Sequence, residues 1–191
     1  PARGAMGGFG TMPTLTWEDL RAIQEEVPSV RWAAPQLRAT ASVLSEDQNW
    51  TTSAFGTTPD YLRIRSWPLA RGEAFTDGDV DGATKVAVLG QTVVDKLFGP
   101  GSNPVGQVIR VKNVPFTVVG VLNALGREAS PGGVPLDQCV FVPISSSRAR
   151  FGDEIRRVST GNEERTRIEL SEIKVMMRSP EEVIPASRLL A

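Results

Sequence analysis

KVAVLGQTVVDKLFGPGSNPVGQVIRVKNVPFTVVGVL, from Lys85 to Leu122, carries the strongest structural pattern in this chain. Its apolar runs and turn residues predict a strand over 85–90, a short helix over 91–98 and a Gly/Pro turn over 99–104. Two further strands, 107–112 and 115–122, flank Asn113 and read as a hairpin. The order of these elements predicts a compact, β-rich unit.

The residues before this stretch predict a helix followed by a hairpin. Thr16 is a good N-cap, and Trp17, Leu20 and Ile23 have the spacing of one helical face, so a helix should run to Pro28. Strands are expected over 37–44 and 50–55, then a short helix over 60–65, a turn over 67–72 and a loop over 75–83. The glycine-rich segment 1–13 is expected to be a flexible lead-in.

The residues after it predict a second mixed region. We expect a loop over 123–137, a strand over 139–142, and a short helix followed by a mobile hairpin tip within 148–165. Residues 167–177 alternate with one slip near Glu172, which indicates a long strand or two strands meeting at a bulge. A final helix should begin at Ser179, and the helical pattern at the end suggests an excised domain.

Composition excludes several classes of function. The 191 residues include 21 basic and 22 acidic side chains, so the net charge of -1 offers no electrostatic footprint for nucleic acid. The absence of histidine removes the commonest acid/base group and zinc ligand. The single cysteine, Cys139, lies in an apolar run and is expected to be buried and inert. No apolar run approaches the length of a membrane span, and the given residues show no basic segment followed by an apolar one, the pattern of a signal peptide.

The acidic segment between Phe75 and Ala83 invites a test for metal binding. Asp77, Asp79 and Asp81 with Gly82 match the first half of a calcium loop, but the position that requires a bidentate glutamate is Val88. A solvated acidic loop is therefore the favoured interpretation, and no cofactor is expected. A carboxylate-dependent hydrolase using these three residues and Glu73 is a weaker alternative, because no motif builds a pocket around them.

Several motifs occur in the order found in one known family. They are Gly56-Thr-Thr-Pro59, Gly72-Glu-Ala-Phe75-Thr76, Val86-Ala-Val-Leu-Gly90, Leu97-Phe98-Gly99, Pro104-Val-Gly106, Ile109-Arg-Val and Phe116-Thr-Val-Val-Gly-Val121. In this order the chain resembles the extracytoplasmic core domain of MacB-type ABC transporter permeases. Each motif is only turn chemistry or apolar strand, so the resemblance concerns fold and points to no catalytic residue.

The resemblance implies an α+β fold in two parts. Residues 14–75 and 167–191 would form a porter-like α/β subdomain, and residues 76–166 would form an inserted, mostly β subdomain. Both ends of the chain would then return to the membrane through flanking helices outside this sequence.

The resemblance also implies a non-catalytic role in transport. Members of the family are homodimeric permeases in the inner (plasma) membrane, with this domain facing the periplasm or the extracellular side. An ABC ATPase subunit or domain drives them. In adaptor-linked exporters the expected partners are a periplasmic adaptor protein and an outer-membrane channel, whereas lipoprotein-releasing and cell-division relatives share similar domains with other partners. Contacts are expected at Trp50, Arg127, Asp153 and Arg157, although Trp50 is equally compatible with the core. A freestanding extracytoplasmic ligand-binding module is the alternative.

Overall fold

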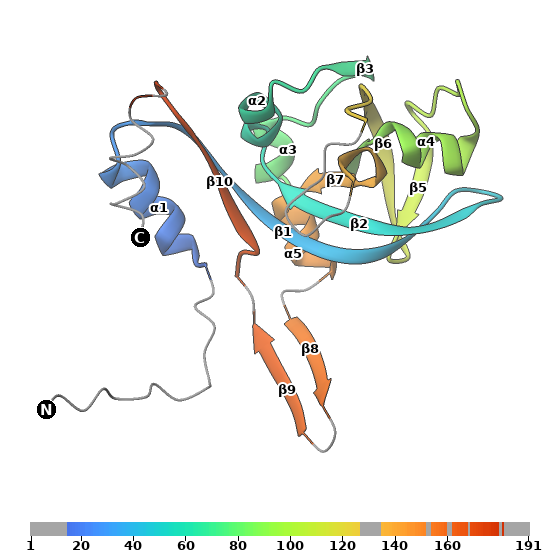
Figure 1. The fold of residues 1–191 in the computed structure, drawn as a ribbon. Coiled ribbons are helices and arrows are strands. Elements are labelled where there is room, and N and C mark those ends of the chain that lie inside the picture. The colour runs from blue at the N-terminus through green and yellow to red at the C-terminus, as the bar shows by residue number, and fades with distance from the viewer. Residues whose placement is uncertain are drawn as a thin grey trace, which may run out of the picture.

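The computed structural model describes residues 15–126, 135–151, 154–159, 162–167, 169–179 and 181, the ranges 154–159 and 162–167 by their backbone alone. The predicted lead-in over 1–13 and all but the first residues of the predicted final helix lie outside this part of the chain. The described residues combine helices and strands, so the predicted α+β class is confirmed (Figure 1).

The elements follow one another along the chain in an irregular mixture of helices and strands. The helices are α1 (Trp17–Glu26), α2 (Asp60–Arg65), α3 (Asp77–Asp81), α4 (Gln91–Phe98), η1 (Leu136–Gln138) and α5 (Ile144–Phe151). The strands are β1 (Val30–Leu44), β2 (Asn49–Thr57), β3 (Leu69–Gly72), β4 (Val86–Leu89), β5 (Val108–Val111), β6 (Val114–Leu122), β7 (Val140–Pro143), β8 (Glu154–Ser159), β9 (Asn162–Arg167) and β10 (Glu172–Met177).

Six strands close into a small barrel. Hydrogen-bonded pairing runs from β1 to β2, β7, β4, β6 and β5, and β5 returns to β1 at Val43 and Leu44. The β2–β7 and β4–β6 pairs are parallel and the other four are antiparallel. Closure leaves these strands few free edges.

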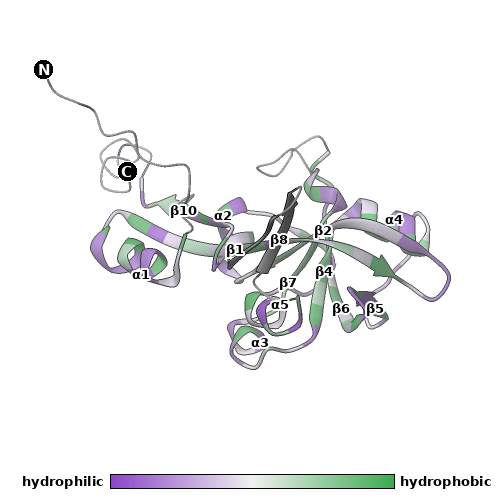
Figure 2. Cartoon of the chain, turned by 90° about the horizontal axis from the view of Figure 1, so that it is seen from below, coloured by the Kyte–Doolittle hydropathy of each residue, from purple (hydrophilic) through white to green (hydrophobic). Residues whose placement is uncertain are grey.

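Alternation along the short strands fills the barrel. Ala87 and Leu89 of β4 point inward with Val140 and Val142 of β7, and all four are fully buried. Helix α4 contributes Val93, Val94 and Leu97 to the same cluster and so closes one end of the barrel. In Figure 2, green hydrophobic segments mark β4 and β6, which agrees with this packing.

The opposite strand faces form a second core outside the barrel. Phe141 lies between the rings of Phe55 and Tyr61, with centroids 5.8 Å and 5.6 Å away, and Trp67 meets its edge at 5.5 Å. The Trp67 indole also donates to the carbonyl oxygen of Asn123 at 2.7 Å. Helix α2 and the segment around residue 67 therefore cover this side of the barrel.

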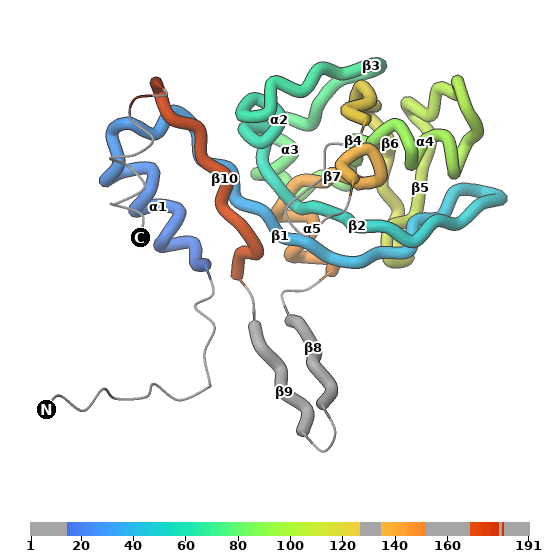
Figure 3. The backbone as a smooth tube through the Cα atoms, viewed as in Figure 1, coloured from blue at the N-terminus to red at the C-terminus, as the bar shows by residue number. Residues whose placement is uncertain are grey.

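Strand β1 extends beyond the barrel into a second layer. Its first half pairs with β10, its second half pairs with β2, and α1 packs on the same layer through Leu20 (Figure 3). Thr16 and Asp19 form a reciprocal capping box at the start of α1, with Asp19 N–H donating to Thr16 Oγ at 3.2 Å. The predicted helix start is confirmed, and the first strand begins seven residues earlier than predicted, at Val30.

Two predicted irregular segments are regular in the structure. Asp77–Asp81, expected as a loop, is helix α3, because Thr76 and Asp79 form a second capping box that starts a helical turn. Within the predicted turn over 67–72, Leu69–Gly72 is strand β3, which pairs with the second half of β6. The Thr76–Asp79 capping pattern is a local signal that could have indicated α3, whereas β3 depends on a distant partner in β6.

The hairpin predicted near the C-terminal end is present. Strands β8 and β9 pair only with each other and extend away from the barrel in Figure 1. Strand β10 is shorter than the predicted strand over 167–177, and Leu170 makes a separate bridge to Leu15. None of the described helices has the length and apolar character needed to cross a bilayer.

Candidate partner-binding groove

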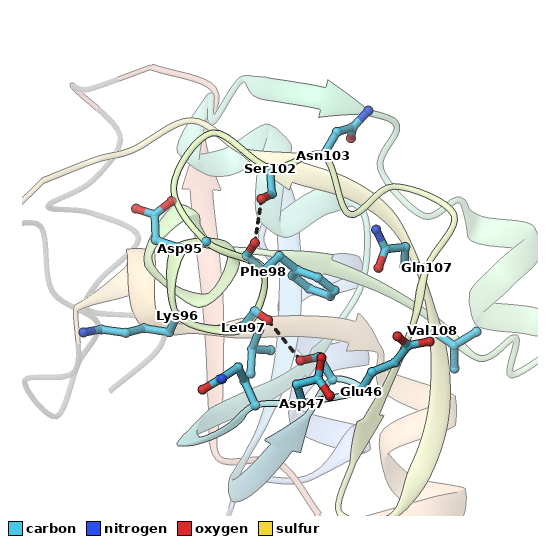
Figure 4. Close-up of a pocket in the computed structure, with 13 residues that line it drawn as sticks. Glu46, Asp47, Asp95, Lys96, Leu97, Phe98, Ser102, Asn103, Gln107 and Val108 are labelled. Atoms are coloured by element: carbon cyan, nitrogen blue, oxygen red, sulfur yellow. Dashed lines mark hydrogen bonds between the residues drawn. The ribbon is translucent and has the colours of Figure 1, made fainter.

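A groove of about 930 Å³ lies at the α4 end of the barrel (Figure 4). One wall is the tip of the β1–β2 hairpin, residues 45–48. The other wall is the end of α4 with residues 99, 102 and 103, and the start of β5 forms the floor. In Figure 1 this end of the barrel lies away from α1 and β10, on the other side of the molecule.

Hydrogen bonds hold the two walls in place. The hydroxyl of Ser45 donates to the carbonyl oxygen of Leu97 at 3.0 Å, which joins the hairpin tip to α4. The hydroxyl of Ser102 donates to Phe98 O at 2.6 Å and satisfies a carbonyl at the end of that helix. Gly99 and Gly101 have φ of 89° and 77°, which side-chain-bearing residues rarely adopt, so the turn depends on glycine.

The groove carries more negative than positive charge. Its lining includes the carboxylates of Glu46, Asp47 and Asp95 and one cation, Lys96. The Lys96 ammonium lies 5.2 Å from the centre of the Trp50 ring, and Asp95 accepts a hydrogen bond from Gln91 at 3.0 Å. Glu46, Asp47 and Lys96 are exposed, so the charge that the groove presents to a partner is net negative.

The structure places the four predicted contact residues in different surroundings. Trp50 lies on β2, where its half-buried ring packs against the barrel core beside Lys96. Arg127 and Asp153 lie outside the described residues. Arg157 lies on β8, of which only the backbone is described. The described part of the chain thus brings only Trp50 near the groove, and a contact role for any of the four stays a prediction.

The carboxylates considered for metal binding or hydrolysis have other roles or none. Asp79 accepts hydrogen bonds from the backbone and hydroxyl of Thr76 at 2.8 Å and 3.0 Å, so it caps α3. Asp77 and Asp81 lie on the same short helix, and exposed Glu73 belongs to the segment after β3. Within the described ranges, no group of three or more potential ligands is arranged to hold a metal ion.

Two weakly acidic groups are buried beside the barrel. Burial raises the pKa of the Cys139 thiol to about 12, so this thiol stays protonated and unreactive at neutral pH. Burial also raises the pKa of Tyr61, and this effect is opposed by the nearby Arg65 charge and by the Gln36 side chain. The predicted burial of Cys139 is confirmed.

Sequence reasoning did not find the groove. The polar run Ser45–Asn49 signalled only a hairpin connection, and residues 99–104 signalled only a turn. The two segments are about fifty positions apart, and they meet because the barrel closes between β1 and β5. The two acids Glu46 and Asp47 in the predicted connection of that hairpin were the available signal.

Comparison with known proteins identifies the class to which this fold belongs. The chain belongs to the MacB-like periplasmic core domain family, whose pattern it matches over residues 1–190. The resemblance read from the ordered motifs is thereby confirmed.

Individual relatives are named as exporters. The chain is 43% identical over 155 residues to "Macrolide export ATP-binding/permease protein MacB" of Syntrophobacter fumaroxidans, an alignment covering 78% of this chain and 21% of that protein. It is 36% identical over 149 residues to "Pyoverdine export ATP-binding/permease protein PvdT" of Pseudomonas putida, covering 74% of this chain and 22% of that protein. The chain thus spans about a fifth of the length of these relatives.

Solved structures share the fold. The periplasmic region of MacB from Actinobacillus actinomycetemcomitans matches with a TM-score of 0.71 at 19% identity, covering 94% of this chain and 72% of that one. The extracellular domain of the transporter YknZ from Gram-positive bacteria matches with a TM-score of 0.69 at 20% identity, covering 93% and 82%. The same fold therefore occurs on the outer side of transporters in two kinds of cell envelope.

Proposed function

We propose that this chain is the periplasmic domain of an ABC exporter permease and transmits ATP-driven motion to substrate export. The observation that carries the proposal is the family match over nearly the whole chain, together with relatives named as macrolide and pyoverdine exporters. The domain would do no chemistry itself. ATP hydrolysis would take place on the ATP-binding part that the names of those relatives include.

We also propose that the domain has two structural parts. The layer of α1, β10 and the first half of β1 would be the porter-like part, and the barrel would be the inserted part. In this division the junction would lie inside β1 and not at residue 75 as predicted. Residues 37–44 of β1 and strand β2, all from the segment 14–75, pair with barrel strands, which supports this proposal. Both ends of the chain would connect to membrane helices beside the porter-like part.

The proposed partners follow from the exporter assignment. The permease would act as a homodimer in the inner membrane, with a periplasmic adaptor protein and an outer-membrane channel beyond it. The groove at the α4 end supports the proposal of a partner contact at that end, because hydrogen bonds fix its walls and Glu46 and Asp47 lie at its rim. A partner with basic side chains would complement these acids.

The full reading frame that contains this chain tests the assignment. We expect it to encode one apolar helix just before Pro1 and three after Ala191, with an ATP-binding part in the same protein or a separate subunit. A reading frame without these helices would overturn the permease assignment and favour a freestanding ligand-binding module.

Charge reversal in the full-length exporter tests the groove. We expect Glu46→Lys with Asp47→Lys to reduce export by at least several-fold at unchanged expression, because the rim would repel a basic partner. The matched control is Glu25→Lys with Glu26→Lys, which reverses two exposed acids on α1. Equal export by both double variants would contradict a contact at the groove.

A further inference from the structure

The strand β1 changes partners at one point in its length. Residues up to Gln36 pair with β10, where Gln36 lies opposite Glu172. From Leu37 onward the strand pairs with β2, where Leu37 lies opposite Gly56. Where a strand ends its pairing with one neighbour and begins pairing with another, some of its backbone N–H and C=O groups lose their ladder partners. The strand can bend at that position unless other groups bond to them.

Here the backbone groups at the change are bonded, two of them by hydroxyl side chains. The Thr57 hydroxyl donates to Pro35 O at 2.9 Å, in a fully buried position. The Arg38 N–H donates to the Ser171 hydroxyl oxygen at 3.0 Å, and the Ser171 N–H donates to Gln36 O at 2.7 Å. Pro35 itself has no N–H to satisfy.

Side chains also pack against β1 at Gln36 and Leu37, on both faces of the strand. On one face Gln36, which is 2% exposed, lies beside Tyr61 of α2, and Arg65 stacks over the Tyr61 ring at 5.5 Å. On the other face Leu37 packs with Ile144 of α5. Helix α2 contacts both β1 and β10, and α5 contacts both β1 and β2.

We propose that residues 35–38 of β1, with Thr57 and Ser171, form a rigid joint that fixes the β10–α1 layer to the barrel as one body. A displacement of that layer then reaches the groove, at the far side of the barrel, without being absorbed by bending. The transmission of motion rests on the proposed function, whereas the rigidity of the joint does not.

Spin labels on this chain test the joint. One label replaces exposed Glu25 on α1 and the other replaces exposed Arg110 on β5, while buried Cys139 stays unlabelled. Double electron–electron resonance should give one narrow distance distribution. Thr57→Val with Ser171→Ala removes both hydroxyls and should at least double the width of the distribution.

Thr52→Val is the matched control. Thr52 is also on β2, and its hydroxyl donates to the backbone carbonyl oxygen of Gln138, but it lies outside the joint. The distribution of this variant should stay as narrow as that of the unmodified chain. A broad or two-peaked distribution in the unmodified chain would overturn the joint, and so would a narrow one in the folded double variant. If circular dichroism shows that the double variant is unfolded, the distance distribution of the unmodified chain alone tests the joint: a narrow single peak supports it, and a broad or two-peaked distribution overturns it.

These outcomes are separate from those of the proposed function. The distances are measured on the chain by itself, so they report rigidity whether or not the full-length protein exports anything. A rigid joint combined with a reading frame lacking membrane helices would defeat only the exporter assignment.

Discussion

Single side chains hold the exposed segments of this domain in position, and Asp137 is the clearest case. It is 6% exposed, and its two carboxylate oxygens accept from the N–H groups of Leu125 and Gly126 at 2.8 Å and 2.9 Å. Both N–H groups lie near the start of the predicted loop over 123–137. Asp137 is therefore a positioning residue for Leu125 and Gly126.

We expect Asp137→Asn to lower the free energy of unfolding by about 1–3 kcal/mol, because the amide keeps one acceptor and turns a donor toward an N–H group. Denaturant titration measures this change. Asp60→Asn is the control, since it weakens a surface ion pair with Arg63 at 2.7 Å that contributes about 0.5 kcal/mol. Equal losses in the two variants would contradict the role of Asp137.

Cys139 and Tyr61 make stability fall at alkaline pH. Both pKa values are raised in the folded state, from usual values of 9.0 and 10.0, so the unfolded chain loses these protons first as pH rises. Stability should be unaffected by Cys139 below about pH 9 and should decrease from there to about pH 12, the folded pKa of the thiol. Cys139→Ala should remove this contribution, which is seen most clearly between pH 9 and 10, below the usual pKa of Tyr61, as measured by urea unfolding at each pH. An unchanged pH profile would show that the thiol is accessible to water.

At the scale of elements, the close approach of α5 to β2 depends on glycine. A Cβ on Gly56 would collide with Ser147 and lie 3.2 Å from the Cα of Ile144. Since Ile144 also packs against β1, the position of α5 is tied to the same part of the fold as the joint.

We expect Gly56→Ala to cost about 1–3 kcal/mol of stability, because backbone atoms of α5 must move. Gly78→Ala in α3 is the control, since its Cβ meets only Thr76 Oγ at 3.5 Å and alanine favours the helix. Thermal melting of both variants decides the matter. A Gly56→Ala variant as stable as the Gly78→Ala variant would show that α5 has room to shift.

At the scale of the whole molecule, two layers share one strand. β1 contributes to the barrel core through Ala41 and Val43 and to the α1 layer through Ala33 and Leu37. Neither layer can lose β1 without breaking the pairing of the other.

We therefore expect the barrel and the α1 layer to unfold together in a single cooperative transition. Differential scanning calorimetry should give a calorimetric enthalpy equal to the van't Hoff enthalpy. Two separated peaks would mean that the layers unfold independently, which would also contradict the rigid joint.

The sequence by itself determined the elements whose signals are local. The apolar run Val86–Leu89, the alternation in Val108–Leu122 and the cap at Thr16 predict these strands and the first helix, because all three signals involve near neighbours. The ordered motifs also identified the family, since turn residues at fixed spacing determine where strands and helices begin and end.

Only the tertiary structure decided how these elements close and where the groove lies. Strand β3 forms because β6 offers a distant edge, and the groove forms because β5 returns to β1. The change of partners between Gln36 and Leu37 cannot be predicted from the side-chain pattern of β1, since both partner strands bond to backbone groups that every residue type carries. Pairing between residues far apart in sequence has no local signature, so the barrel, its groove and the joint appear only once the chain is folded.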